Sequence, residues 1–213
     1  MILIGQYDSP FVRRVAIALA TYGLAFEHRP WSVFGDVEKI AKLNPLRRVP
    51  TLVLDGGEVV TDSLTILLAV DQLVGPQRAS LARGGDDGRE LQRLSAFAAG
   101  VAEKAVSLVY ERELRDEAFP LWVERCRAQV GETLDLLEAM REARSSVYLF
   151  DDALSHADVI LAAAIRFVRE ALSAEFGWSG WPALIAHSDL CEALPAFREM
   201  SQPFKLATPD GAA

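Results

Sequence analysis

The sequence contains little cysteine and histidine, and it has no long apolar run. Its two cysteines, Cys126 and Cys191, lie far apart in helix-like sequence, which excludes a disulfide framework and a zinc pattern. The three histidines lack metal-ligand spacing, so we expect no bound metal. Because no run of eighteen apolar residues occurs, we expect no membrane-spanning helix.

Positive charge is also in deficit, since the net charge is −8. This balance argues against nucleic acid or an anionic membrane as the main partner. Residues 1–76 are nearly neutral, with seven Lys/Arg against eight Asp/Glu, so a small anion meets no general repulsion there. The start of the chain lacks the pattern of a signal peptide, and we therefore expect a cytoplasmic location.

The chain divides into two parts with different hydrophobic periods. Residues 1–76 alternate between strand and helix patterns in the order β-α-β-α-β-β-α, with a hairpin around Asp55-Gly56-Gly57. A glycine- and charge-rich stretch, residues 77–88, is interpreted as a linker. Residues 89–213 are predicted to form an all-helical domain, in which the helix that begins near residue 155 is buried on most sides.

Three turns in the first part carry candidate binding groups. Ser9 follows the first strand and precedes Pro10, which fits the first position of a helix. Such a serine is either a plain helix cap or a hydroxyl aimed at a substrate.

The second turn is Val49–Pro50, directly before a predicted strand. If this peptide bond is cis, the backbone of Val49 can pair with an extended peptide; the alternative is a trans proline that merely starts the strand.

The third turn is the pair Asp62-Ser63 at the start of a helix. We interpret Ser63 as its N-cap. A helix N-terminus with a hydroxyl suits a carboxylate, and Asp62 suits an ammonium group.

Ser155 and Asp158 have the spacing of a capping box, which nucleates the buried helix and has a structural role.

The stretches "SPFVRRVAIAL", "NPLRRVPTLVLDGGEVVTDSLTIL" and "YLFDDALSHADVILAAA", in this order, resemble a cytosolic glutathione transferase of the serine type over nearly the whole chain. The resemblance implies a thioredoxin-like N-terminal domain, an all-helical C-terminal domain, a homodimer, and conjugation of glutathione to electrophiles in detoxification. Glutathione is then a co-substrate, and no metal is needed.

The resemblance assigns roles residue by residue. Ser9 matches the serine that hydrogen-bonds the glutathione sulfur, and Val49 matches the residue before the cis proline, Pro50. Arg48 resembles a basic residue near the glycyl carboxylate, while Asp62 and Ser63 match the pair that holds the γ-glutamyl end. Tyr7 also lies close to the first strand, where tyrosine-type relatives use a tyrosine, but Ser9 is preferred because it starts the helix.

The second substrate is expected to be an apolar electrophile, held between the domains. The candidate wall residues, for which ordinary core packing is the alternative, are Phe11, Phe34, Val106 and Tyr110. A thiol-disulfide reductase is disfavoured because a serine forms no mixed disulfide. A non-catalytic glutathione- or protein-binding module remains the alternative function.

Overall fold

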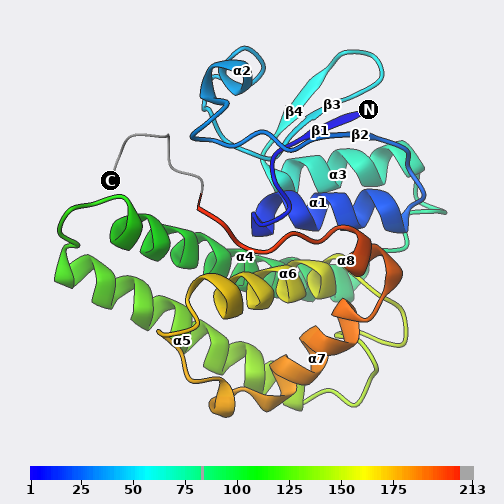
Figure 1. Cartoon of the computed structure of the whole chain (residues 1–213). Coiled ribbons are helices and arrows are strands. Elements are labelled where there is room, and N and C mark those ends of the chain that lie inside the picture. The colour runs from blue at the N-terminus through cyan, green and yellow to red at the C-terminus, as the bar shows by residue number, and fades with distance from the viewer. Residues whose placement is uncertain (83, 207–213) are drawn as a thin grey trace. The chain divides into compact units, whose positions relative to one another are not determined.

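The computed structural model describes residues 1–82 and 84–206, and these form two compact units (Figure 1). The first unit comprises Met1–Ala79 together with the segment that begins at Pro195, and the second comprises Ser80–Leu194. Among the helices of the described residues, none combines the length and the apolar character that a membrane-spanning segment needs.

The first unit is a four-stranded mixed sheet with helices. Its elements before the second unit are β1 (Ile2–Ile4), α1 (Pro10–Thr21), β2 (Glu27–Arg29), α2 (Val37–Ala41), β3 (Thr51–Val53), β4 (Val59–Thr61) and α3 (Ser63–Val74). The strand order is β2-β1-β3-β4, with β1 parallel to β2 and antiparallel to β3. Helices α1 and α3 pack together along one face of the sheet (Figure 1). The predicted β-α-β-α-β-β-α order and the thioredoxin-like class are confirmed.

The register of the sheet brings three chain turns to one edge. Ile4 at the end of β1 pairs with Thr51 at the start of β3, and Thr51 pairs with Thr61 at the end of β4. The segments beyond these residues are therefore neighbours, because paired residues lie side by side across a ladder. They are the turn before α1, the Val49–Pro50 bond and the start of α3.

Gly5 makes this convergence possible. Its φ of +126° lies in a region that glycine adopts without a side-chain clash. A methyl group on Gly5 would fall 2.8 Å from Cβ of Val49 and would also overlap Cγ2 of Val12. The end of β1 thus packs directly against the loop that carries Val49 and against the first turn of α1.

Arg13 attaches the C-terminal segment to the first unit. Its side chain is 3 % exposed, and its Nε and Nη2 donate to the carbonyl oxygens of Met200 and Phe197, both at 2.8 Å. The guanidinium also lies over the Phe197 ring, 5.7 Å from its centroid. Helix α8 (Pro195–Glu199) is consequently packed on α1.

The unit boundaries differ from the expected 1–76, 77–88 and 89–213. The segment from Pro195 belongs to the first unit, because Arg13 holds its carbonyl groups. Helix α4 begins at Gly85, within the expected linker, because Asp86 and Asp87 complement the positive end of the helix. Arg83 of the expected linker and residues 207–213 of the expected second domain lie outside the described residues.

The second unit is helical, as predicted. Its elements are α4 (Gly85–Glu113), α5 (Pro120–Glu142), α6 (His156–Ala171), the short 3₁₀ helix η1 (Trp178–Gly180) and α7 (Pro182–Glu192). Helix α6 packs against α4 and α7, and α5 packs against α4 and α7 (Figure 1). Every residue of α6 from His156 to Ile165 is buried, which explains why the middle of this helix carries almost no charge.

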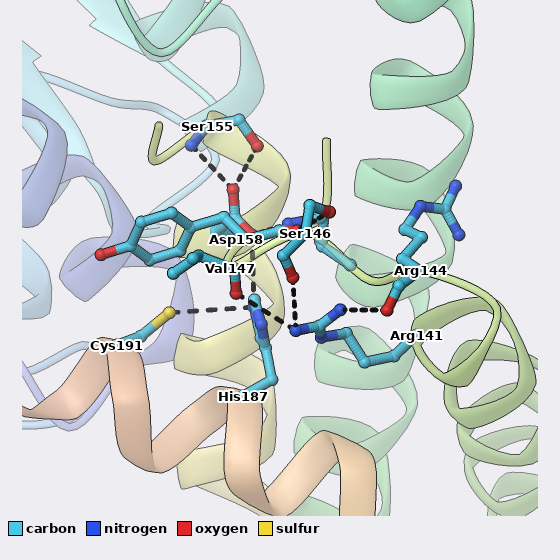
Figure 2. A network of polar contacts seen from close by, with 10 residues as sticks. Arg141, Arg144, Ser146, Val147, Ser155, Asp158, His187 and Cys191 are labelled. Atoms are coloured by element: carbon cyan, nitrogen blue, oxygen red, sulfur yellow. Dashed lines mark hydrogen bonds and ion pairs between the residues drawn. The ribbon is translucent and has the colours of Figure 1, made fainter. Parts of the chain in front are cut away.

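The capping box at the start of α6 is present and belongs to a larger buried network (Figure 2). The backbone N–H and the hydroxyl of Ser155 both donate to Oδ2 of Asp158. The other carboxylate oxygen, Oδ1, accepts from the Leu149 N–H at 2.8 Å and lies 3.3 Å from Nε2 of His187. Asp158 therefore joins the start of α6 to the preceding loop and to α7, which sequence spacing alone did not reveal.

His187 and Cys191 complete this network on α7. Sγ of Cys191 lies 3.8 Å from Nε2 of His187 (Figure 2). Burial lowers the pKa of His187 to about 4, which outweighs the opposing effect of Asp158. Burial also raises the pKa of the Cys191 thiol. Both groups are therefore neutral at physiological pH.

Candidate functional site

Ser9 caps α1 with its side chain at the edge of the sheet where the turn before α1, the Val49–Pro50 bond and the start of α3 meet. We call this the converging edge. Ser9 has an extended backbone (φ −71°, ψ 123°), and its hydroxyl accepts from the Val12 N–H at 3.4 Å. This hydrogen bond is long, so the cap is weak. Pro10 is the first residue of the helix. Because the hydroxyl accepts in the cap, its own proton remains available for donation to a ligand. Cap and substrate donor are therefore compatible roles for one half-buried serine.

Tyr7 lies in the same turn but is held differently. Its ring stacks on the His28 ring, with 3.9 Å between centroids and 2° between planes. Burial raises the pKa of Tyr7 to about 12, and the Glu199 carboxylate acts in the same direction. Tyr7 thus keeps its proton throughout the physiological range, and its ring is fixed against β2.

The loop before β3 is braced by Asn44, a residue that the sequence reasoning missed. Asn44 is 2 % exposed, and its Nδ2 donates to the Arg48 carbonyl at 3.0 Å and to Oγ1 of Thr51 at 3.2 Å. Its Oδ1 accepts from the Leu46 N–H, which is the local turn typical of asparagine. The asparagine-proline pair at residues 44–45 is the sequence signal for such a turn.

The Val49–Pro50 peptide bond is cis, as the resemblance implies. Pro50 is buried and Val49 is half-buried next to Gly5, while the Arg48 side chain is exposed. The loop therefore offers the Val49 backbone at the edge where the Ser9 turn and the start of α3 converge.

The start of α3 differs from the prediction in one respect. Asp62, and not Ser63, is the N-cap: its Oδ1 accepts from the N–H groups of Leu64 at 2.9 Å and Thr65 at 3.3 Å. Asp62 has φ +68° and ψ 127°, which lies outside the left-handed helical region and is a conformation that residues other than glycine rarely adopt. Ser63 is instead the first helical residue, and the assignment of Ser63 as the cap was wrong by one position.

Ser63 has a partner that no local pattern indicates. Nη2 of Arg14, on α1, donates to the Ser63 hydroxyl oxygen. Both side chains are buried, with Arg14 4 % and Ser63 2 % exposed. The Arg14 guanidinium also lies over the Phe11 ring, 5.2 Å from its centroid. A buried arginine thus connects the two helices whose N-termini flank the converging edge.

The expected wall residues fall in both units. Phe11 and Phe34 are half-buried in the first unit. In the second unit Val106 is half-buried and Tyr110 is 38 % exposed, one turn apart on α4. Within the described residues, no group of three or more His, Cys, Asp or Glu side chains is arranged to hold a metal ion.

The fold and this edge define a thioredoxin-like domain joined to a helical domain, and comparison with known proteins gives the family. The family model of the glutathione S-transferase N-terminal domain matches residues 3–78, and that of the C-terminal domain matches residues 120–198. The chain belongs to the glutathione S-transferase family.

Individual relatives agree with this assignment. The chain is 28 % identical over 179 residues to the uncharacterized GST-like protein YibF of Escherichia coli, covering 79 % of this chain and 82 % of that protein. A crystal structure of a glutathione S-transferase from Methylobacterium radiotolerans, in complex with glutathione sulfonate, has a TM-score of 0.89 at 24 % identity and covers 100 % of this chain and 99 % of its own. A Pseudomonas fluorescens family member with bound glutathione has a TM-score of 0.80 at 25 % identity, covering 95 % and 99 %.

Proposed function

We propose that this protein is a serine-type transferase, which binds glutathione at the converging edge and adds its thiolate to an apolar electrophilic molecule. The observation that carries the proposal is the register of the sheet: it aligns Ile4, Thr51 and Thr61, and so gathers the turns of Ser9, Val49 and Ser63. The bound glutathione sulfonate and glutathione in the Methylobacterium and Pseudomonas proteins support it.

The turns offer complementary groups for the tripeptide. The backbone of Val49 pairs with the cysteinyl part as an added strand. Oδ1 of the exposed Asp62 is occupied by backbone N–H groups, which leaves Oδ2 for the γ-glutamyl ammonium group. Ser63 takes the γ-glutamyl carboxylate, and the exposed Arg48 takes the glycyl carboxylate.

Ser9 supplies the chemistry by stabilising the thiolate. A free thiol has a pKa of about 8.5, and lowering it by about two units requires roughly 2.7 kcal/mol of preferential stabilisation of the anion. The Ser9 hydroxyl donates one hydrogen bond to the sulfur, and the start of α1 adds positive potential. Ser9 keeps its own proton, so this mechanism needs no general base.

The second substrate is proposed to be apolar, because the candidate wall residues are Phe11, Phe34, Val106 and Tyr110. The thiolate attacks the electrophilic carbon and forms the carbon–sulfur bond. The leaving group departs with the electron pair of the broken bond, or, in an addition, the carbon chain accepts a proton from water. In either case the thiolate is the nucleophile, and its availability at neutral pH sets the rate.

Calorimetric titration with glutathione, followed by a conjugation assay with a panel of aromatic halides, epoxides and enones, tests the proposal. Binding at millimolar glutathione or below, together with turnover of at least one electrophile, is the expected result. Binding without turnover of any of them would favour a non-catalytic glutathione-binding module. Absence of binding would leave a protein-binding module as the function.

A homodimer is proposed on the basis of α3. Leu64 and Leu68 lie one turn apart on this helix and are 50 % and 55 % exposed. Two such side chains on one face favour burial against another chain. Light scattering should give the mass of two chains, and Leu68→Lys should give the mass of one. A cytoplasmic location remains a prediction from the sequence.

A further inference from the structure

We propose that Arg14 is a positioning residue for glutathione: it fixes the Ser63 hydroxyl as a hydrogen-bond donor and supplies the positive charge that the γ-glutamyl carboxylate requires. This inference rests on the proposed function. Arg14 lies on α1 and contacts the Ser63 hydroxyl on the neighbouring helix α3.

The contact with Arg14 determines where the hydroxyl proton of Ser63 points. A guanidinium has only donors, whereas a serine hydroxyl has one proton and two lone pairs. Because Arg14 donates to the Ser63 oxygen, one lone pair is occupied and the proton is directed elsewhere. With Ser63 2 % exposed, water has little influence on this choice. The hydroxyl is thereby prepared to donate to an acceptor at the start of α3.

Arg14 also brings a positive charge to the start of α3. A helix N-terminus normally attracts a carboxylate through its free N–H groups. At α3 the Asp62 carboxylate already accepts from Leu64 and Thr65, and its negative charge opposes that of an incoming carboxylate. The ammonium group of the ligand pairs with Asp62, and the γ-glutamyl carboxylate still requires a positive partner close to Ser63. The Arg14 guanidinium, one hydrogen bond away, is in position to provide it.

The Arg14 side chain is also held rigidly between α1 and α3. Arg14 is 4 % exposed, it projects from α1 toward α3, and it lies over the Phe11 ring. Helices α1 and α3 pack together, so the guanidinium is fixed relative to Ser63 before any ligand arrives. A preorganised charge loses little conformational entropy on binding, and this increases its contribution to affinity.

The test compares two ligands, glutathione and γ-aminobutyryl-cysteinyl-glycine, which lacks only the α-carboxylate. Arg14→Gln is expected to weaken glutathione binding by about tenfold to a hundredfold, on the scale of a charge-assisted hydrogen bond. Affinity for the truncated ligand should change less than about threefold. The loss should appear in the KM for glutathione, with kcat and the pKa of the bound thiol unchanged, and Arg14→Lys should recover part of it.

Arg13→Gln is the matched control. It removes a neighbouring buried arginine on the same helix, whose Nε and Nη2 donate to main-chain carbonyls of the C-terminal segment. This variant should lose stability but keep its preference for glutathione over the truncated ligand. A double-mutant cycle with Ser63→Ala should show that the Arg14 and Ser63 effects are not additive. Additive effects, or equal losses for both ligands, would overturn the proposal.

A measurement on the unaltered protein covers the case in which the Arg14 variants do not fold. The Nε–H resonance of Arg14 should shift when glutathione binds and stay in place when the truncated ligand binds. Equal shifts with both ligands, or none with either while backbone signals of Val49 respond, would contradict the role of Arg14. If backbone signals respond to neither ligand, the proposed function itself has failed.

Discussion

Gly5 packs against Val49 so closely that a single added methyl group would lie 2.8 Å from the valine Cβ. This contact joins β1 to the loop that carries the cis Val49–Pro50 bond. The candidate glutathione site therefore depends on a residue that has no side chain to offer a ligand.

Gly5→Ala is expected to destabilise the first unit by about 3 kcal/mol, since it combines an unfavourable φ with overlap against two side chains. Denaturant titration measures the loss. Gly57→Ala is the control, because Gly57 also has a positive φ (+85°) but has nothing within 4 Å of its Cβ position. It should cost only about 1 kcal/mol. Equal losses in the two variants would contradict the close-packing explanation.

Ser9→Ala should reduce the thiolate fraction of bound glutathione and lower turnover. Thiolate absorbance across a pH series measures the first effect, and a conjugation assay measures the second. Because the Ser9–Val12 hydrogen bond is long, stability should fall by less than about 1 kcal/mol. Tyr7→Phe should leave the pKa of the bound glutathione thiol unchanged. If Tyr7→Phe instead reduces the thiolate fraction and Ser9→Ala leaves it unchanged, Tyr7 is the residue that stabilises the thiolate.

Asp62→Ala should weaken glutathione binding by roughly 1–3 kcal/mol, through loss of the partner for the ammonium group. It should also cost about 1 kcal/mol of stability, because Asp62 is the N-cap of α3. Calorimetry and thermal melts separate the two effects. Asp55→Ala, in the hairpin before β4, is the control for a lost surface charge and should leave affinity unchanged.

Asp158→Ala should destabilise the fold by about 3–5 kcal/mol, because it leaves buried N–H groups of Ser155 and Leu149 without an acceptor. Glutathione affinity of the folded fraction should not change. The measurement is a denaturant titration with a binding titration on the folded protein. Weaker affinity at unchanged stability would indicate that Asp158 belongs to the ligand site.

The free energy of unfolding should decrease as the pH is lowered from about 6.5 to 4, because His187 takes up a proton more readily in the unfolded chain. Burial lowers its folded pKa to about 4, while the unfolded chain binds the proton near 6.5. Within this window the unfolded state holds more protons, so acidification favours unfolding, and above 6.5 the effect vanishes. His187→Gln should therefore reduce the stability difference between pH 7 and pH 4.5 by about 2 kcal/mol. An unchanged difference would show that His187 does not titrate in this way.

The sequence alone determined the order of elements and the capping box. Alternating periods distinguish strands from helices locally, and Ser155 and Asp158 interact within one helical turn. It placed the cap of α3 one residue late, because Asp62 and Ser63 are both favourable caps and only backbone geometry distinguishes them. The sequence pattern also predicted the helical domain from residue 89, whereas α4 begins at Gly85. Glycines next to acidic residues are typical of both linkers and helix starts.

Only the tertiary structure decided which distant residues meet. The Arg14–Ser63 hydrogen bond joins residues 49 positions apart, and the Asp158–His187 contact joins α6 to α7. Arg13 draws the C-terminal segment onto the first unit. Each contact depends on how helices pack, and a local pattern carries no information about the partner. The sequence therefore determined the turns that carry the candidate ligand groups, while strand register and helix packing decided which buried side chains support them.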